Sequence, residues 1–100
     1  MENKYGIKEK TYLEILKIFQ DTIEVKKVIL FGSRARGDYK QTSDIDLAIT
    51  FENEEKKLQV IRNLDDLNCA LKFDVLNIEK IENEKLLENI QTDGIVIYEK

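Results

Sequence analysis

The sequence contains no histidine and no proline, and its only cysteine is Cys69. Without histidine, the commonest general base and the usual zinc ligand are both absent, so Ser-His-Asp, Cys-His and HExxH mechanisms are excluded. A single cysteine allows no internal disulfide, and its apolar neighbours favour a small core residue without a catalytic role. Catalysis would therefore depend on carboxylates, hydroxyls, lysine and arginine, a set that favours hard cations bound through oxygen.

Long hydrophobic runs are also missing. No apolar stretch approaches the roughly 20 residues of a membrane-spanning helix, and the first residues, Met1 to Lys4, show no signal-peptide pattern. We therefore expect a cytoplasmic protein without membrane contact. The net charge of −4, from 16 basic and 20 acidic residues, disfavours a long nucleic acid as substrate, because proteins that bind one carry a basic surplus or a basic face. The sequence leaves self-association open.

The residues that are present suit one globular unit. The chain has 100 residues, of which 42% are hydrophobic and 36% charged. This is enough apolar content for one modest core, and the chain is too short for two. We expect a single domain, residues 1–100.

The spacing of apolar residues predicts the order of helices and strands. Helical spacing marks residues 7–23, 58–67 and 82–92, with the first face formed by Tyr12, Leu16, Phe19 and Ile23 and the second by Leu58, Ile61, Leu64 and Leu67. Strands are expected at residues 25–31, 44–51, 71–78 and 95–98. Gly94 suits the left-handed position after a helix end. The expected fold is α/β (α+β), a small mixed sheet covered by helices, with the first two strands antiparallel because only a short helical turn joins them.

One strand-turn-strand unit holds the residues that could carry chemistry. Gly32 and Ser33 end the first strand, and Asp44 and Asp46 follow after ten residues. Glycine lets the backbone turn sharply and approach a ligand, and free N–H groups at the start of the following helical turn favour an anion such as a triphosphate. Carboxylates two residues apart on a strand project from the same face and repel each other unless a cation lies between them. This spacing indicates a magnesium site beside a phosphate cradle.

Further residues extend this set. Arg34 and Arg36 are close enough in sequence to supply guanidinium groups for phosphate oxygens, whereas Lys40 fits a solvated loop. Asp74 lies within an apolar strand, where an unpaired buried charge would be costly. If the third strand lies beside the second, Asp74 can complete a cluster of three carboxylates that holds two divalent ions.

Each of these features also has an ordinary interpretation. A DxD pair in an alternating strand is usually a solvent-facing side, and a Gly-Ser after a strand is usually a plain turn. Their conjunction with a third carboxylate on another strand favours a functional site. The GxxxxGK[ST] and GxGxxG motifs are absent, which argues against a P-loop enzyme and a dinucleotide-binding fold.

The segment Val28-Ile-Leu-Phe-Gly-Ser-Arg-Ala-Arg-Gly37, followed by Ser43-Asp-Ile-Asp-Leu47, resembles the signature of the DNA polymerase β-like nucleotidyltransferase superfamily. More narrowly, it is similar to that of the minimal nucleotidyltransferases, the antitoxin half of two-gene modules whose toxin is a HEPN-domain ribonuclease. The signature runs from residue 28 to residue 47, about a fifth of the chain. The expected order of strands and helices fits the family over nearly all of the chain.

The resemblance implies roles for individual residues. Gly32 and Ser33 would bind the β and γ phosphates of ATP, within a nucleotide-binding set of Gly32, Ser33, Arg34, Arg36 and Ser43. Asp44 and Asp46 would ligate both magnesium ions. Asp74 would be the third carboxylate, beside the attacking hydroxyl, with Asp65, Asp66 and Glu79 as weaker substitutes.

The implied reaction transfers AMP from ATP to an acceptor hydroxyl and releases pyrophosphate. The chain is too short for an acceptor-binding domain of its own, and the resemblance points to a tyrosine of a HEPN partner, whose modification would silence the toxin. Two alternatives stay open. One is a small-molecule nucleotidyltransferase, although the antibiotic-modifying relatives carry an additional helical domain. The other is a binding antitoxin that acts by contact alone, with a structural or regulatory nucleotide site.

Overall fold

The computed structural model of the chain describes residues 3–67 and 70–100. Its helices are α1 (Glu9–Asp21), α2 (Ser33–Arg36), α3 (Lys57–Asp65) and α4 (Glu84–Asp93). Its strands are β1 (Asn3–Lys4), β2 (Ile7–Lys8), β3 (Val25–Phe31), β4 (Ile45–Phe51), β5 (Phe73–Asn77) and β6 (Ile95–Glu99). Two short 3-10 helices, η1 (Glu54–Lys56) and η2 (Ile78–Lys80), follow β4 and β5. The predicted order of elements from α1 to β6 is confirmed, and the prediction for Cys69 falls outside the described residues.

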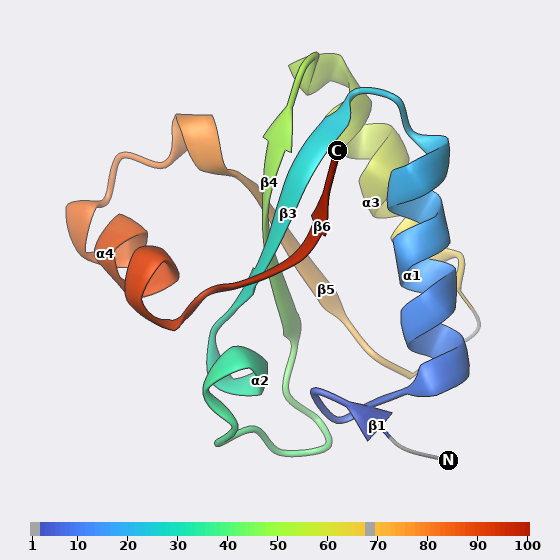
Figure 1. Ribbon diagram of the computed structural model, residues 1–100, viewed down its shortest axis with the longest axis vertical. Coiled ribbons are helices and arrows are strands. Elements are labelled where there is room, and N and C mark those ends of the chain that lie inside the picture. Colours follow the sequence, from blue (N-terminus) through green and yellow to red (C-terminus); the bar gives the residue numbers. More distant parts are fainter. Residues whose placement is uncertain (1–2, 68–69) are drawn as a thin grey trace.

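The four longer strands form one mixed sheet in the order β5-β4-β3-β6 (Figure 1). β3 runs antiparallel to both of its neighbours, β4 and β6, which confirms the predicted antiparallel pairing of the first two strands. β4 and β5 are parallel, joined by a crossover through α3. Because β3 ends where β4 and β5 begin, the residues after β3 and those at the start of β4 and β5 meet at one end of the sheet.

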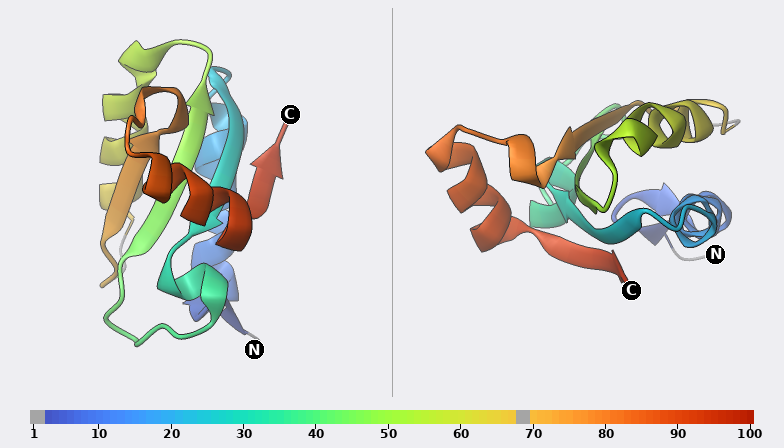
Figure 2. Two further views of the ribbon diagram at one scale, coloured as in Figure 1. Left: turned by 90° about the vertical axis from the view of Figure 1, so that its left-hand side faces the viewer. Right: turned by 90° about the horizontal axis from the view of Figure 1, so that it is seen from above.

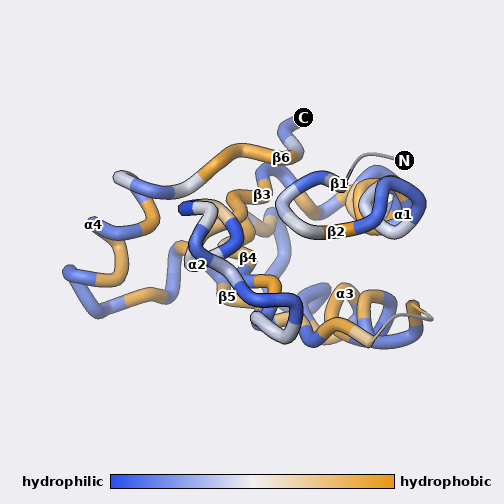
Figure 3. Tube along the Cα trace, turned by 90° about the horizontal axis from the view of Figure 1, so that it is seen from below, coloured by the Kyte–Doolittle hydropathy of each residue, from blue (hydrophilic) through white to orange (hydrophobic). Residues whose placement is uncertain are grey.

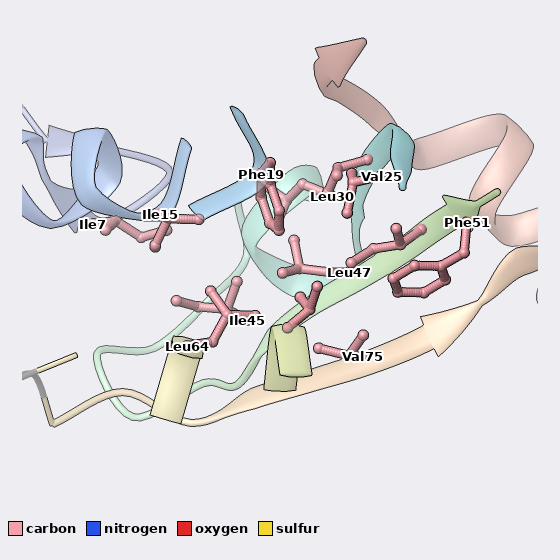
Figure 4. Packing of buried hydrophobic residues seen from close by; sticks show 13 residues of the cluster. Ile7, Ile15, Phe19, Val25, Leu30, Ile45, Leu47, Phe51, Leu64 and Val75 are labelled. Carbon is pink, nitrogen blue, oxygen red and sulfur yellow. The ribbon is translucent and has the colours of Figure 1, made fainter. Parts of the chain in front are cut away.

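Helices cover the two faces of the sheet unequally. α1 and α3 lie on one side, and α4 lies on the other (Figures 1 and 2). The main core fills the space between the sheet and the pair α1 and α3, and Figure 4 shows its packing. Its fully buried members include Phe19, Val28, Leu47, Ile49 and Leu64. Burial of this kind contributes about 25 cal/mol for each Å² of apolar surface removed from water.

A second, smaller cluster joins α4 to the opposite face of the sheet. Its buried residues are Phe31, Ala48 and Ile90. The other face of β4 is therefore covered at Ala48, which is 1% exposed, and only half-covered two residues earlier at Asp46. This difference leaves the start of β4 open on the face that carries its aspartates.

The helix faces differ from the prediction at two positions. Ile23 is 69% exposed and Leu58 is 67% exposed, whereas Ile15 and Val60 are fully buried. α1 ends at Asp21, so Ile23 lies beyond the helix, and Leu58 lies in the first turn of α3, away from the sheet. Apolar spacing alone identified the helices correctly and placed part of their buried faces wrongly.

The backbone conformation predicted for Gly94 is also wrong. Its backbone is extended, with φ −68° and ψ 146°, and not left-handed. A Cβ at this position would collide with the carbonyl oxygen of Ile90 and lie 2.6 Å from the Cγ2 of Ile29. Glycine is therefore required because the chain passes closely over α4 as it enters β6.

An N-terminal hairpin precedes α1 and was not predicted. β1 and β2 pair antiparallel around Tyr5 and Gly6, which both have positive φ, 55° and 74°. Two consecutive positive φ values are typical of a tight hairpin turn. Ile7 of β2 is 2% exposed and belongs to the main core, so the hairpin is attached to the body of the protein. No helix among the described residues is both long and apolar enough to cross a lipid bilayer.

Candidate active site

The turn after β3 is the first part of the candidate site. At Gly32 the backbone has φ 78° and ψ −158°, a conformation that is essentially confined to glycine. A Cβ at this position would also collide with the Oδ2 of Asp46. Gly32 is thus required by both backbone conformation and space, and its backbone lies directly against the Asp46 carboxylate.

The short helix α2 begins immediately after this turn. The amides of Ala35 and Arg36 each donate to the carbonyl oxygen of Gly32 at 3.1 Å, and Gly37 closes the helix by donating to the carbonyl oxygen of Ser33 at 2.9 Å. The first N–H groups of a helix have no acceptor within it and favour an anion. The predicted helical turn is confirmed, and it places backbone donors beside the aspartates.

Three aspartates lie around the turn, on two neighbouring strands. Asp46 of β4 pairs with Phe31 of β3 on one side and with Asp74 of β5 on the other. Residues at the same register position on adjacent strands point to the same face, so the Asp46 and Asp74 side chains lie next to each other. Asp44 lies two residues earlier, just before β4 begins. The prediction that the third strand lies beside the second is confirmed.

The burial of these carboxylates differs from the prediction. Asp46 is half-buried, whereas Asp44 and Asp74 are exposed. Asp74 had been expected to be buried within an apolar strand, but β5 is an edge strand of the sheet. Its carboxylate therefore faces solvent at the open end of the sheet, where a substrate has access.

The surroundings of Asp46 disfavour its charged form. Burial raises the pKa of Asp46 above its ordinary value of 3.8, and the neighbouring charges of Asp74 and Asp44 raise it further. The guanidinium of Arg36 partly offsets this increase. Like charges held this close favour either a proton or a cation between them.

The donor set fits a magnesium ion by its chemistry. Carboxylate oxygens are the ligands that Mg²⁺ prefers, and the mutual repulsion recorded at Asp46 is what a divalent cation would relieve. Across residues 3–67 and 70–100, no three such side chains already converge on a single point. In the same part of the chain, the carboxylates of Asp44 and Asp74 form no hydrogen bond or ion pair that would hold them in place, so they are free to turn toward a ligand.

The two arginines of α2 have different environments. Arg36 is exposed, pairs with Asp38 at 3.4 Å and lies near enough to Asp46 to lower its pKa. Arg34 is 1% exposed, and within residues 3–67 and 70–100 its hydrogen bonds go to backbone carbonyl oxygens and not to the aspartates. The phosphate contacts predicted for both arginines stay predictions; the burial of Arg34 argues against its own, whereas the exposed position of Arg36 near Asp46 is compatible with its own.

Arg34 holds together three segments of backbone. Its Nε and Nη2 donate to the carbonyl oxygen of Ser43 at 3.1 and 2.9 Å, Nη2 donates to that of Gln41 at 3.1 Å, and Nη1 donates to that of Tyr5 at 3.0 Å. The guanidinium also lies over the Tyr39 ring, 5.2 Å from its centroid. These contacts compensate a buried charge that has no carboxylate partner in the part of the chain that the structure describes. Arg34 fixes the loop that leads to Asp44.

The same network explains the hairpin glycine. A Cβ at Gly6 would collide with the Tyr39 ring and lie 2.8 Å from Nη1 of Arg34. The hairpin turn therefore packs directly against the loop before β4. The sequence analysis did not predict this contact, because nothing in the local pattern connects Gly6 with Arg34.

The remaining predicted residues serve the loop or lie elsewhere. Ser43 accepts a hydrogen bond from the Lys40 amide through its Oγ at 2.8 Å and holds Arg34 through its carbonyl oxygen. Its predicted contact with a nucleotide stays a prediction, and the structure gives Ser43 a role in the loop. Lys40 is exposed, as expected. Asp74 occupies the position beside Asp46, whereas the substitutes Asp65, Asp66 and Glu79 lie at the end of α3 and in η2.

Comparison with known proteins agrees with this geometry. The family model described as polymerase beta, nucleotidyltransferase matches residues 14–100. Two candidate protein adenylyltransferases of Methanocaldococcus jannaschii are similar in sequence. One is 33% identical over 86 residues and the other 34% over 84, and each match covers 81% of this chain and 85% of the relative.

Solved structures share the fold. A toxin-antitoxin complex crystallised with AMP-PNP contains a chain that matches with a TM-score of 0.70 at 21% identity, over 89% of this chain and 73% of that one. A complex of a tri-AMPylated Shewanella oneidensis HEPN toxin with its MNT antitoxin matches with a TM-score of 0.64 at 18% identity, over 92% and 72%. At these identities the structures establish the fold, and the family model and the relatives establish the family. The chain belongs to the polymerase beta nucleotidyltransferase family and is a nucleotidyltransferase.

Proposed function

We propose that the chain is a magnesium-dependent adenylyltransferase that transfers AMP from ATP to a tyrosine hydroxyl of a HEPN-type toxin, and that it thereby acts as the antitoxin in the cytoplasm. One observation carries the proposal. The Gly32 turn lies against Asp46, and Asp46 lies beside Asp74 at the open end of the sheet. A phosphate cradle and a carboxylate pair thus adjoin each other, as phosphoryl transfer between two substrates requires.

The nucleotide would bind by its phosphates. The backbone amides at the start of α2 and the Ser33 hydroxyl supply neutral donors, and Arg36 supplies a positive charge on the same side as Asp46. Gly32 has no side chain, so the phosphates can approach the backbone closely. These contacts position the α-phosphorus beside the carboxylates.

Asp44, Asp46 and Asp74 would hold the magnesium ions. When bound there, Mg²⁺ supplies Lewis acidity that favours ionisation of the acceptor hydroxyl and neutralises charge on the leaving pyrophosphate. The hydroxyl oxygen forms a bond to the α-phosphorus, the bond from that phosphorus to the bridging oxygen breaks, and pyrophosphate leaves with the electron pair. Asp74 takes up the hydroxyl proton and passes it to solvent. No covalent intermediate with the protein is required.

The names of similar proteins support a protein acceptor. The M. jannaschii relatives are described as candidate protein adenylyltransferases, and the S. oneidensis complex contains an AMPylated HEPN toxin. A partner protein that presents a tyrosine at the open end of the sheet would supply the acceptor.

Intact mass spectrometry tests the proposal. A HEPN protein encoded beside this chain, co-expressed with it and purified, should carry additions of AMP-sized mass, whereas the same protein expressed alone should not. Chelation of divalent cations should prevent the addition in a purified reaction with ATP. A tightly bound but unmodified partner would contradict the enzymatic proposal and favour an antitoxin that acts by contact.

A further inference from the structure

A pocket of about 760 Å³ lies beside Asp44, and Gly32 is not one of the residues that line it. Three segments line it, which are the hairpin turn with the start of α1 (Gly6, Lys8 and Thr11), the loop before β4 (residues 41–44) and the residues that lead into β5 (residues 70–72). Figure 3 views the end of the molecule at which the hairpin, α2 and the start of β4 and β5 meet. We refer to this cavity as the hairpin pocket.

The hairpin pocket and the phosphate cradle share one residue. Asp44 lines the pocket, whereas Gly32, Ser33 and Arg36 do not. A transferase with two substrates must bring both to the same carboxylates from different directions, because the attacking and leaving oxygens lie on opposite sides of the phosphorus. The phosphate cradle accounts for the direction from which the nucleotide approaches. The hairpin pocket adjoins the same carboxylate cluster at Asp44, through residues other than those of the cradle.

We propose that the hairpin pocket seats the acceptor segment of a protein substrate, a tyrosine with acidic residues beside it. This inference rests on the proposed function and adds where the acceptor binds and what chemistry it has. The volume is within the range of pockets that enclose a compact ligand, and a tyrosine ring with its neighbouring backbone is of that size. Ala70 and Leu71 give the pocket an apolar wall for the ring, and Gln41 and Thr42 supply polar groups for the backbone.

Two lysines determine the charge that the pocket favours. Lys8 and Lys72 both line it and are exposed, and neither forms an ion pair within residues 3–67 and 70–100. They come from opposite walls, the hairpin and the entry to β5, so an acidic residue on either side of the acceptor tyrosine would meet a positive charge. The chain as a whole has a net charge of −4, so this local positive pair would favour acidic acceptor segments over basic ones.

The pocket is held in shape by the network around Arg34. The hairpin turn and the loop before β4 are two of its walls, and Arg34 donates to Tyr5 in the first and to Gln41 and Ser43 in the second. A pocket with walls fixed in this way can bind an acceptor without first ordering its own backbone.

Reversing the two charges tests the inference. The probes are short synthetic peptides with one central tyrosine, flanked either by aspartate and glutamate or by lysines, and the reaction follows transfer of labelled AMP from ATP. The wild-type protein should modify the acidic peptide with a kcat/KM about tenfold higher than the basic one, a difference of about 1.4 kcal/mol that two rim charges acting through solvent can supply. The Lys8→Glu/Lys72→Glu protein should reverse this preference and keep its affinity for magnesium-ATP in calorimetry.

The matched control is Lys17→Glu/Lys85→Glu, which changes two exposed lysines on α1 and α4 that do not line the pocket. It should retain the wild-type preference. The inference is overturned if the pocket variant retains that preference. It is also overturned if the pocket variant loses affinity for ATP, which would mean that the nucleotide binds in the pocket, or if the wild-type protein binds ATP and labels neither peptide. Failure of the wild-type protein to bind magnesium-ATP would instead contradict the proposed function.

Discussion

Asp46 is the residue at which the electrostatics of the candidate site are concentrated. Burial and the charges of Asp74 and Asp44 disfavour its ionised form, and the chain offers only the partial compensation of Arg36. At neutral pH and without a ligand, this carboxylate therefore reduces the stability of the fold. A divalent cation bound beside it would relieve this cost.

We predict that Asp46→Asn stabilises the ligand-free protein at pH 7 by about 0.5 kcal/mol, or about 3 °C in Tm, because it removes the repulsion between carboxylates. The pKa of Asp46 is raised in the folded state, so the wild-type destabilisation is complete above that raised pKa. It is relieved as the pH falls through that value and disappears below the ordinary pKa of 3.8. Thermal unfolding from pH 7 to pH 3.5 should show the two proteins converging.

Magnesium-ATP should reverse the ranking. It should raise the Tm of the wild-type protein and have little effect on Asp46→Asn, since a ligand that binds only the folded state stabilises it in proportion to its affinity. Equal stabilisation of both proteins would contradict the assignment of Asp46 as a metal ligand.

Gly32 and Gly37 flank α2 and form a natural comparison. Both have positive φ, but a Cβ at Gly32 would collide with the Asp46 carboxylate, whereas a Cβ at Gly37 has nothing within 4 Å. We predict that Gly32→Ala lowers the affinity for magnesium-ATP about tenfold or more by displacing Asp46. Gly37→Ala should cost about 1 kcal/mol of stability and leave binding unchanged. Calorimetry and denaturant unfolding measure the two effects, and equal binding by both variants would make the Gly32 turn an ordinary one.

Residue types and spacing predicted the parts of the site that depend on short segments of sequence. Gly32 and Asp46 could be identified because each lies on a strand-turn-strand unit of 20 residues whose local geometry is strongly constrained. The exposure of Asp74 could not, since it depends on which strand lies at the edge of the sheet. The role of Arg34 could not be predicted from the sequence either. Three of its four hydrogen bonds go to the loop before β4, and one goes to Tyr5, 29 residues away.

At the scale of elements, the main feature is the connection between the hairpin, α2 and the loop before β4. β1 and β2 have two residues each, too few to produce a period in the sequence. The hairpin is defined instead by Ile7 in the core and by the contact of Gly6 with Arg34 and Tyr39. The longer helices and strands were predicted because their periodic patterns extend over several turns or alternations.

We predict that Arg34→Lys weakens this connection. An ammonium group on a flexible stem cannot donate simultaneously to Tyr5, Gln41 and Ser43, whereas the planar guanidinium does. The loss should be about 2 kcal/mol of stability, faster hydrogen exchange in residues 38–44, and a lower kcat with a smaller change in ATP affinity. Arg62→Lys, on the exposed side of α3, is the control. If Arg34→Lys lost stability while kcat and loop exchange stayed at wild-type values, Arg34 would have no role in positioning Asp44.

At the scale of the whole molecule, the covering of the sheet explains where chemistry can occur. α1 and α3 bury one face along its length, and α4 buries the other face around Ala48 and Phe31. Within residues 3–67 and 70–100, the only helix at the end of the sheet that carries Asp46 and Asp74 is the single turn of α2 (Figure 1). Under the proposed function this end receives the two substrates, and a partner protein that presents an acceptor there would complete the enclosure.

The last prediction separates binding of such a partner from its modification. The triple variant Asp44→Asn, Asp46→Asn, Asp74→Asn changes two exposed side chains and one half-buried one, so the core stays intact. Of the residues that line the hairpin pocket it changes only Asp44, to an amide of nearly the same size. It changes the net charge from −4 to −1, because three negative charges are removed. A partner with acidic residues beside its acceptor should bind the variant at least as well as the wild type.

We therefore expect the triple variant to form the complex with a HEPN-type partner, measured by size-exclusion chromatography, and to transfer no AMP, measured by intact mass. In cells it should fail to protect against the toxin at expression levels at which the wild-type protein protects fully. Toxicity distinguishes the two kinds of antitoxin, because a contact antitoxin needs the surface and an enzymatic one needs the carboxylates. Full protection by the triple variant, together with a toxin that carries no nucleotide when recovered from wild-type cells, would show that contact neutralises the partner and that the nucleotide site has another purpose.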